Sequence, residues 1–267
     1  MLCWAAGGRG LGCRDIESLV ALVNQGMRFS IAAFAAWAPG VETAEAWLEW
    51  ASGHRRIEGE SEPAVRAMAP ILRRRAGLLD RMALEVAYRC LGDRRDVPAI
   101  FSSRHGETSR SVDLLTDLAK GLPLSPTTFG LSVHNATGGL FSIARGDHAS
   151  SSALAAGPSS VEHAVIEACG LLADGACEVL LVVYDRPLPA LYAAYQDCHE
   201  QPFAWAWLMQ PPTSDVVSLS WSKAEESESA SAECWSAGLE ILRFYLRRER
   251  SLERVCQRRH WLWSRDA

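Results

Sequence analysis

Lysine is scarce in this 267-residue chain. Only Lys120 and Lys223 occur among the 27 basic residues, and all the others are arginine. The 32 acidic residues outnumber the basic ones, so the net charge is −5. A chain without an excess of positive charge lacks the electrostatic footprint of a nucleic-acid-binding protein, and we expect no nucleic-acid partner. We attribute the arginine bias to genomic base composition rather than to function.

Long apolar runs and paired cysteines are also missing. No apolar run approaches the roughly 18 residues of a membrane-spanning helix, so we expect no membrane span. The 8 cysteines include no C-x-x-C pair and no Cys/His cluster at zinc-site spacing. This pattern excludes a secreted disulfide framework and favours reduced thiols in a cytoplasmic protein. We expect neither a metal nor another cofactor.

The middle of the chain has the pattern of a strand, a sharp turn, a helix and a second strand. Ser150–Ala156 is a run of small residues, and Gly157–Pro158 interrupts it in a way suited to a helix N-terminus. Apolar residues at helical spacing continue to Ala173, and Asp174–Gly175 closes the helix. Val179–Tyr184 is the continuous apolar run of a strand covered on both faces. This pattern predicts an α/β fold whose turn lies where α/β enzymes often hold a nucleophile.

The same stretch resembles the core of the β-ketoacyl synthases, which have the thiolase-like fold. The family's order of motifs is matched at Ser125–Pro126, Asn135, Gly138–Gly139, Gly146 and Ala164. The resemblance implies the N-terminal half of a thiolase-like fold, with element order βαβαβαββ and a mixed sheet covered by helices.

In this register the family's nucleophilic cysteine falls on Pro158, and Leu154 to Ser160 contains no cysteine. Proline supplies neither a thiolate nor the backbone N–H that helps to hold an oxyanion, and one such donor contributes roughly 3–4 kcal/mol in other enzymes. The family's second half, which carries two catalytic histidines, also has no place in this chain. We therefore predict a degenerate nucleophile position and no catalytic residue.

The resemblance then implies a non-catalytic subunit, similar to the short chain-length-factor-like proteins of aryl polyene clusters. Such a subunit pairs with a complete β-ketoacyl synthase and shapes acyl-chain elongation in polyene, polyketide or fatty-acid-like biosynthesis. Ketosynthase dimers pair the small-residue strand across their two-fold axis, where close approach leaves little space for side chains. The predicted partner interface is therefore Asn135, Ser151, Ala153 and Ala155.

Two alternatives from other classes stay open. The first is a serine-dependent acyltransferase or hydrolase that uses Ser159 or Ser160 with His105 or His134, because a serine at a helix N-terminus has a favourable dipole. G-P-S-S-V lacks the final glycine of a G-x-S-x-G elbow, however. The second alternative is an isolated small-molecule-binding or regulatory module.

The chain divides into four predicted segments. Residues 1–26 are an N-terminal extension of uncertain status, and residues 27–222 form the ketosynthase-like domain. Within this domain, Phe203–Met209 and Asp215–Trp221 have the alternation of a hairpin. Residues 223–232 form a linker rich in Glu and Ser, and residues 233–267 a C-terminal amphipathic helix.

This last segment is rich in arginine. Arg247, Arg248 and Arg254 lie on the basic side of the expected helix. Such a surface suits an acidic partner, and the family resemblance suggests an acyl carrier protein. The alternative is a docked helix whose basic side is simply solvated.

Overall fold

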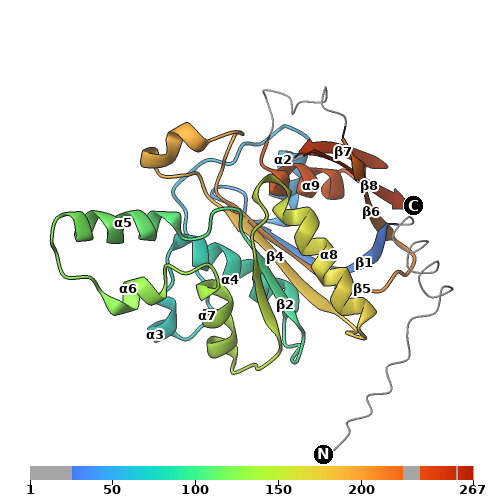
Figure 1. The fold of residues 1–267 in the computed structure, drawn as a ribbon. Helices are drawn as coiled ribbons and strands as arrows, with labels where there is room; N and C mark the ends of the chain where they lie inside the picture. The colour runs from blue at the N-terminus through green and yellow to red at the C-terminus, as the bar shows by residue number, and fades with distance from the viewer. Residues whose placement is uncertain (1–25, 225–234, 257, 267) are drawn as a thin grey trace, which may run out of the picture.

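The computed structural model describes residues 26–224, 235–256 and 258–266. In these ranges the chain forms one mixed sheet of eight strands, in the order β3-β2-β4-β5-β1-β6-β8-β7 (Figure 1). Strands β2, β3 and β4 run parallel, and all other neighbours are antiparallel. The strands are β1 (Met27–Trp37), β2 (Ala99–Ser102), β3 (Ser151–Leu154), β4 (Val179–Asp185), β5 (Phe203–Gln210), β6 (Val216–Lys223), β7 (Ser251–Cys256) and β8 (Arg259–Asp266).

Helices cover both faces of this sheet. One face packs against α2, α8 and α9, and the other against α4 and α7. The helices are α2 (Ala44–Ala51), α3 (Pro70–Arg73), α4 (Leu78–Leu91), α5 (Thr108–Ala119), α6 (Pro126–Gly130), α7 (Ala136–Arg145), α8 (Ser160–Ala173) and α9 (Ala237–Leu246), with short 3₁₀ turns η1 (Gly157–Ser159) and η2 (Ala190–Tyr195). The α/β class and the mixed sheet covered by helices are confirmed. Residues 27–223 hold six strands, one more than the predicted string βαβαβαββ.

The alternation along β5 shows why the two faces differ. Trp205 and Trp207 are fully buried on the side of α8 and α9, whereas Ala204 and Ala206 face α4. The small side chains let α4 lie close to the sheet, and Cys90 Sγ of α4 comes within 3.6 Å of the Ala206 carbonyl oxygen. Successive residues of a strand point to opposite faces, so one short sequence fills two cores.

The predicted hairpin of residues 203–209 and 215–221 is wrong. Strands β5 and β6 have those positions, but β1 lies between them and pairs with both. The Ser30 hydroxyl of β1 donates to the Asp215 carbonyl at 2.6 Å and accepts from the Thr213 N–H at 2.9 Å, which fixes the connection across the end of β1. The alternation of apolar residues predicts both strands, but it carries no information about which strand becomes the neighbour.

The predicted C-terminal helix over residues 233–267 is also wrong. Helix α9 ends at Leu246, Arg248 adopts a left-handed backbone with φ of 52°, and β7 and β8 follow as a hairpin. Strand β8 pairs with β6 along its length, so this segment extends the main sheet. Trp261 and Trp263 alternate with less buried neighbours and enter the core beside α9.

Two predicted boundaries fall largely outside the described residues. Of the extension 1–26 the structure describes only Gly26, and of the linker 223–232 only Lys223 and Ala224. Lys223 is still part of β6 and pairs with Arg259.

Candidate functional site

The sharp turn that the sequence predicts lies between β3 and α8, at residues 155–159, and is called the elbow below. Gly157 has a left-handed φ of 59°, a backbone that glycine adopts without a steric penalty. Pro158 is the middle residue of η1, and α8 begins two residues later. The Ser160 hydroxyl donates to the Gly157 carbonyl at 2.7 Å and accepts from the Ala156 N–H at 2.9 Å, so that it closes the turn on itself.

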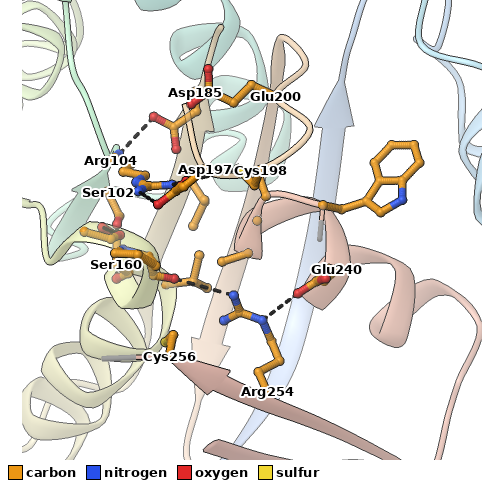
Figure 2. A pocket seen from close by; sticks show the side chains of 18 of the residues that line it. Ser102, Arg104, Ser160, Asp185, Asp197, Cys198, Glu200, Glu240, Arg254 and Cys256 are labelled. Atoms are coloured by element: carbon orange, nitrogen blue, oxygen red, sulfur yellow. Dashed lines mark hydrogen bonds and ion pairs between the residues drawn. The ribbon is translucent and has the colours of Figure 1, made fainter. Parts of the chain in front are cut away.

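A buried charge network holds the C-terminal hairpin against this elbow. Glu162 lies in the first turn of α8 with no exposed surface and forms an ion pair with Arg254 of β7. Arg254 Nε also donates to Glu240 of α9 at 2.7 Å, and its Nη2 lies 3.5 Å from the Pro158 carbonyl oxygen. Figure 2 shows Arg254 between the elbow and Glu240.

The electrostatics of this network favour the charged guanidinium. Burial alone would lower the pKa of Arg254, but the carboxylates of Glu162 and Glu240 outweigh it and raise that pKa above its usual value. Sequence reasoning missed Glu162, although an acidic residue directly after Val161 on an apolar helix face was the signal that could have revealed it.

A pocket of about 410 Å³ opens beside the elbow. Its wall contains Ser102 at the end of β2, Asp185 at the end of β4, and the first residues of α8 (Figure 2). The carboxyl ends of parallel strands and a helix N-terminus meet here, which is where ligands bind in many α/β folds. The C-terminal segment supplies the opposite wall with Trp235, Arg254 and Cys256.

Asp185 is the most strongly perturbed carboxyl group of this pocket. Burial raises its pKa to about 7, although it accepts hydrogen bonds from the Ser103 hydroxyl at 2.8 Å and the Arg104 N–H at 2.9 Å. A carboxyl group with such a pKa exists in both protonation states near neutral pH.

One ion pair and one histidine–carboxylate contact lie in the wall of the pocket. The Arg104 guanidinium forms a bidentate pair with Asp197, with both N–O distances at 2.6 Å, and this pairing lowers the pKa of Asp197. His105 Nε2 lies 3.2 Å from a Glu200 carboxylate oxygen. Burial and the charge of Arg104 nevertheless lower the pKa of His105, which favours the neutral imidazole.

The candidate serines, Ser159 and Ser160, and the candidate histidines, His105 and His134, have hydrogen-bond partners other than one another. Both hydrogen bonds of the Ser160 hydroxyl go to the backbone, and the Ser159 hydroxyl donates to the Ala156 carbonyl at 3.2 Å. His105 is held by Glu200, and His134 Nε2 lies 2.9 Å from the Ser103 carbonyl oxygen. Each of the two histidines that the hydrolase hypothesis offers as alternatives therefore has its Nε2 engaged with another group.

The predicted interface residues lie near the β3 edge of the sheet. Ser151, Ala153 and Ala155 are exposed, and the alternate residues Ser152 and Leu154 are half-buried. Strand β3 pairs only with β2 among the described strands, so its other backbone edge is open. Asn135 is exposed just before α7, which packs beside β3.

The three arginines of the predicted docking surface do not share one helix. Arg247 and Arg248 follow α9 and are exposed, whereas Arg254 lies on β7 with only 10% of its side chain accessible. Arg247 pairs with Glu249 at 3.2 Å.

Two other kinds of site are absent from the residues that the structure describes. None of their helices is both long and apolar enough to cross a membrane. In the same ranges no three His, Cys, Asp or Glu side chains group as metal ligands.

Comparison with known proteins gives consistent matches. A family model described as "Beta-ketoacyl synthase, N-terminal domain" matches residues 47–264. A chain from the complex of the ketosynthase ApeO with its chain length factor ApeC, from Xenorhabdus doucetiae, is 26% identical and superposes with a TM-score of 0.78. The match covers 89% of the present chain and 99% of that chain. No curated protein matches the sequence.

Two further solved structures share the fold at lower identity. The ishigamide ketosynthase/chain length factor is 13% identical with a TM-score of 0.60, over 76% of this chain and 69% of that one. A chain of the AntDE:AntF complex, a type II polyketide synthase acyl carrier protein with its ketosynthase, is 10% identical with a TM-score of 0.64. That match covers 90% of this chain and 99% of the other.

Proposed function

The chain belongs to the β-ketoacyl synthase N-terminal domain family, and on that premise we propose that it is a non-catalytic, ketosynthase-like subunit. It pairs with a complete β-ketoacyl synthase and shapes acyl-chain elongation in polyene, polyketide or fatty-acid-like biosynthesis. The observation that carries this proposal is the elbow, where Pro158 occupies the turn and no cysteine occurs from Leu154 to Ser160. A ketosynthase thiolate acts as the nucleophile that takes up an acyl group, and proline has no group that can do so.

The open edge of β3 supports the pairing part of the proposal. Its exposed side chains at Ser151, Ala153 and Ala155 are small, so another strand can approach closely. A free strand edge favours pairing with a second chain, and proteins that stay monomeric usually protect it with charge or proline. Strand β3 has neither protection.

A helical region that projects from the molecule offers apolar surface for the same partner. Helices α5 and α6 stand away from the sheet (Figure 1). Leu115, Leu118 and Phe129 on these helices, and Ile143 on α7, are each more than half exposed. Exposed apolar side chains that gather on one region commonly mark a protein-protein interface. The ketosynthase complex from Xenorhabdus doucetiae supports a partner of this kind.

Co-purification tests the pairing. We expect Ala153→Arg and Ala155→Arg each to abolish association of the tagged chain with a complete β-ketoacyl synthase of the same organism. A charge desolvated at the interface without a partner costs several kcal/mol. The circular dichroism of the isolated variants should stay that of the wild type, because both side chains are exposed.

Leu154→Arg is the matched control. Leu154 is half-buried and packs against the core, so this variant should unfold the subunit itself. Wild-type yields of complex with both alanine variants would show that β3 is not the interface.

Carrier-protein docking is a second, separate part of the proposal. Arg247 and Arg248 are exposed and could contact an acidic partner, whereas Arg254 is committed to Glu162 and Glu240. Replacing Arg247 and Arg248 together by Gln should weaken binding of an acyl carrier protein in surface plasmon resonance. Unchanged affinity would exclude this surface.

A further inference from the structure

A second cavity, of about 780 Å³, lies next to the elbow pocket and shares Trp235 with it. Its walls come from α2, the loop after α2, α9 and the start of β7. The side chains of Trp50, Leu239 and Phe244 are buried and form an apolar wall together with Trp235. The volume is within the range of roughly 300–1,000 Å³ that is usual for small-molecule sites.

Two arginines line this cavity without a counter-charge. Arg243 is half-buried, and its Nε donates to the carbonyl of Ala51 at the end of α2 at 3.1 Å. Arg56 reaches the same cavity from the loop after α2. The described residues provide neither of these two guanidinium groups with an ion-pair partner.

Most of the other charges of the wall have partners. Arg55 pairs with Glu49 at 3.2 Å, and the exposed Glu253 lies 3.3 Å from His260 Nε2. Glu249 pairs with Arg247 at 3.2 Å, and Glu240 pairs with Arg254 at 2.7 Å. Glu58 also lines the cavity, but it is exposed. A half-buried guanidinium that lacks a carboxylate bears a desolvation cost, which a bound anion would offset.

We propose that this cavity binds a small amphiphilic anion, that is, an apolar body that carries a carboxylate or a phosphate. The head group lies on Arg56 and Arg243, and the apolar body lies against Trp50 and Trp235. The bond from Arg243 Nε to Ala51 holds the guanidinium in place before the ligand arrives, which reduces the entropy lost on binding. The concave apolar wall fits a small molecule better than the convex surface of an acidic protein. This binding does not depend on pairing with a ketosynthase.

Titration calorimetry on the full chain with decanoate and with decyl phosphate tests the site. We expect saturable binding of at least one of the two anions, and comparison of the two identifies the head group. Arg243→Gln should weaken that binding at least tenfold, and Arg56→Gln at least fivefold. The neutral 1-decanol has the same chain, so its weaker binding should not respond to either substitution.

Arg74→Gln is the matched control. Arg74 is exposed and lies outside the cavity, and its substitution removes the same charge. It should leave the affinity for both anions unchanged. Arg56 is exposed as well, so its substitution tests the site even if Arg243→Gln reduces the stability of the fold. No saturable binding of either anion, or equal affinity for wild type, Arg56→Gln and Arg243→Gln, would overturn the proposal.

Discussion

At the scale of single residues, Arg254 shows how a charge can be placed inside this fold. Its guanidinium has two carboxylate partners from different helices, Glu162 and Glu240. Two opposite charges in a poorly solvated site are tolerable only when they face each other, since each one alone would lose its hydration without compensation. The network therefore determines how β7 sits against the elbow.

Removing one partner of this network tests how much the network contributes to the free energy of unfolding. Arg254→Ala leaves Glu162 buried and unpaired, and we expect the free energy of unfolding to fall by about 3–5 kcal/mol. The double substitution Arg254→Leu with Glu162→Leu should recover a large part of this loss, because no uncompensated charge then stays in the interior. Urea unfolding measures both. Arg28→Ala is the control, since the Arg28–Asp266 pair is exposed and should contribute at most about 1 kcal/mol. A loss of under about 1 kcal/mol in Arg254→Ala would contradict this account.

Buried carboxyl groups should make stability depend on pH in an unusual direction. Burial and the neighbouring Asp80 raise the pKa of Glu107 to about 7 from its ordinary value of 4.5. The folded state then binds the proton more tightly than the unfolded state, so stability is greatest below pH 4.5 for this group and falls as the pH rises to about 7. Burial raises the pKa of Asp185 to about 7 as well, with the same sign.

Glu107→Gln isolates this contribution. Between pH 5 and pH 8 we expect the wild type to lose about 2.5 kcal/mol more stability than the variant, at 1.36 kcal/mol for each pKa unit. Urea midpoints at the two pH values measure the difference. The lowered pKa of Asp197 acts only below its ordinary value of 3.8, outside this window. Equal pH dependence in both proteins would show that Glu107 is ionised in the fold.

At the scale of elements, the C-terminal hairpin of β7 and β8 contributes buried side chains to the hydrophobic core. Trp263 of β8 is fully buried and lies opposite Leu219 of β6 and Leu252 of β7. Its neighbour Leu262 points to the other face and is half-buried. The alternation of a strand therefore separates two adjacent side chains into very different environments.

This alternation predicts unequal effects of two neighbouring substitutions. Trp263→Ala should reduce the free energy of unfolding by about 3–5 kcal/mol, as expected for a large aromatic side chain in a core. Leu262→Ala should cost clearly less, because its side chain is only partly buried. Chemical denaturation of both variants checks the ranking. Similar losses of unfolding free energy for Trp263→Ala and Leu262→Ala would contradict the alternation of buried and partly buried side chains along β8.

Local patterns predicted the elements around the elbow, because each of them is specified by nearby residues. The small-residue strand, the helix that ends at Ala173 and the apolar strand from Val179 all have their expected places. The neighbour of β5 could not be predicted, since strand pairing depends on residues far apart in the chain. The predicted C-terminal helix extends too far, because apolar residues at near-helical spacing continue past Arg248. No glycine or proline in the sequence marks the left-handed turn at that residue.

The candidate site was predictable only in part for the same reason. The family model confirms the family resemblance on which the choice of Pro158 rests. The role of Pro158 itself remains a prediction. The pair of Glu162 and Arg254 joins residues 92 positions apart, and no spacing rule connects them. Sequence reasoning placed Arg254 on a solvated helix face, whereas its partners exist only once β7 has joined the sheet.

At the scale of the whole molecule, the described part of the chain is a single sheet with two different ends. One end is β3, short and open, with exposed small side chains next to the elbow. The other end is β7, which the Arg254 network fastens to the elbow and which lines its pocket. The β3 end therefore offers an open strand edge, where we propose that the second subunit binds, while β7 lines the pocket beside the elbow from within the chain.

This arrangement leads to a prediction about activity. The purified chain should not condense malonyl- and acyl-carrier-protein substrates, and Pro158→Cys should not restore condensation. A thiol at that position would still face a single histidine, His105, among the described residues that line the pocket, and not the two catalytic histidines that the family resemblance implies for a ketosynthase. Mass spectrometry of carrier-protein-bound products measures the reaction.

Adding a complete ketosynthase should yield elongated products, with a chain-length distribution that differs from that of the ketosynthase alone. Condensation by the isolated chain would refute the non-catalytic role, whereas an unchanged distribution would refute only its influence on chain length.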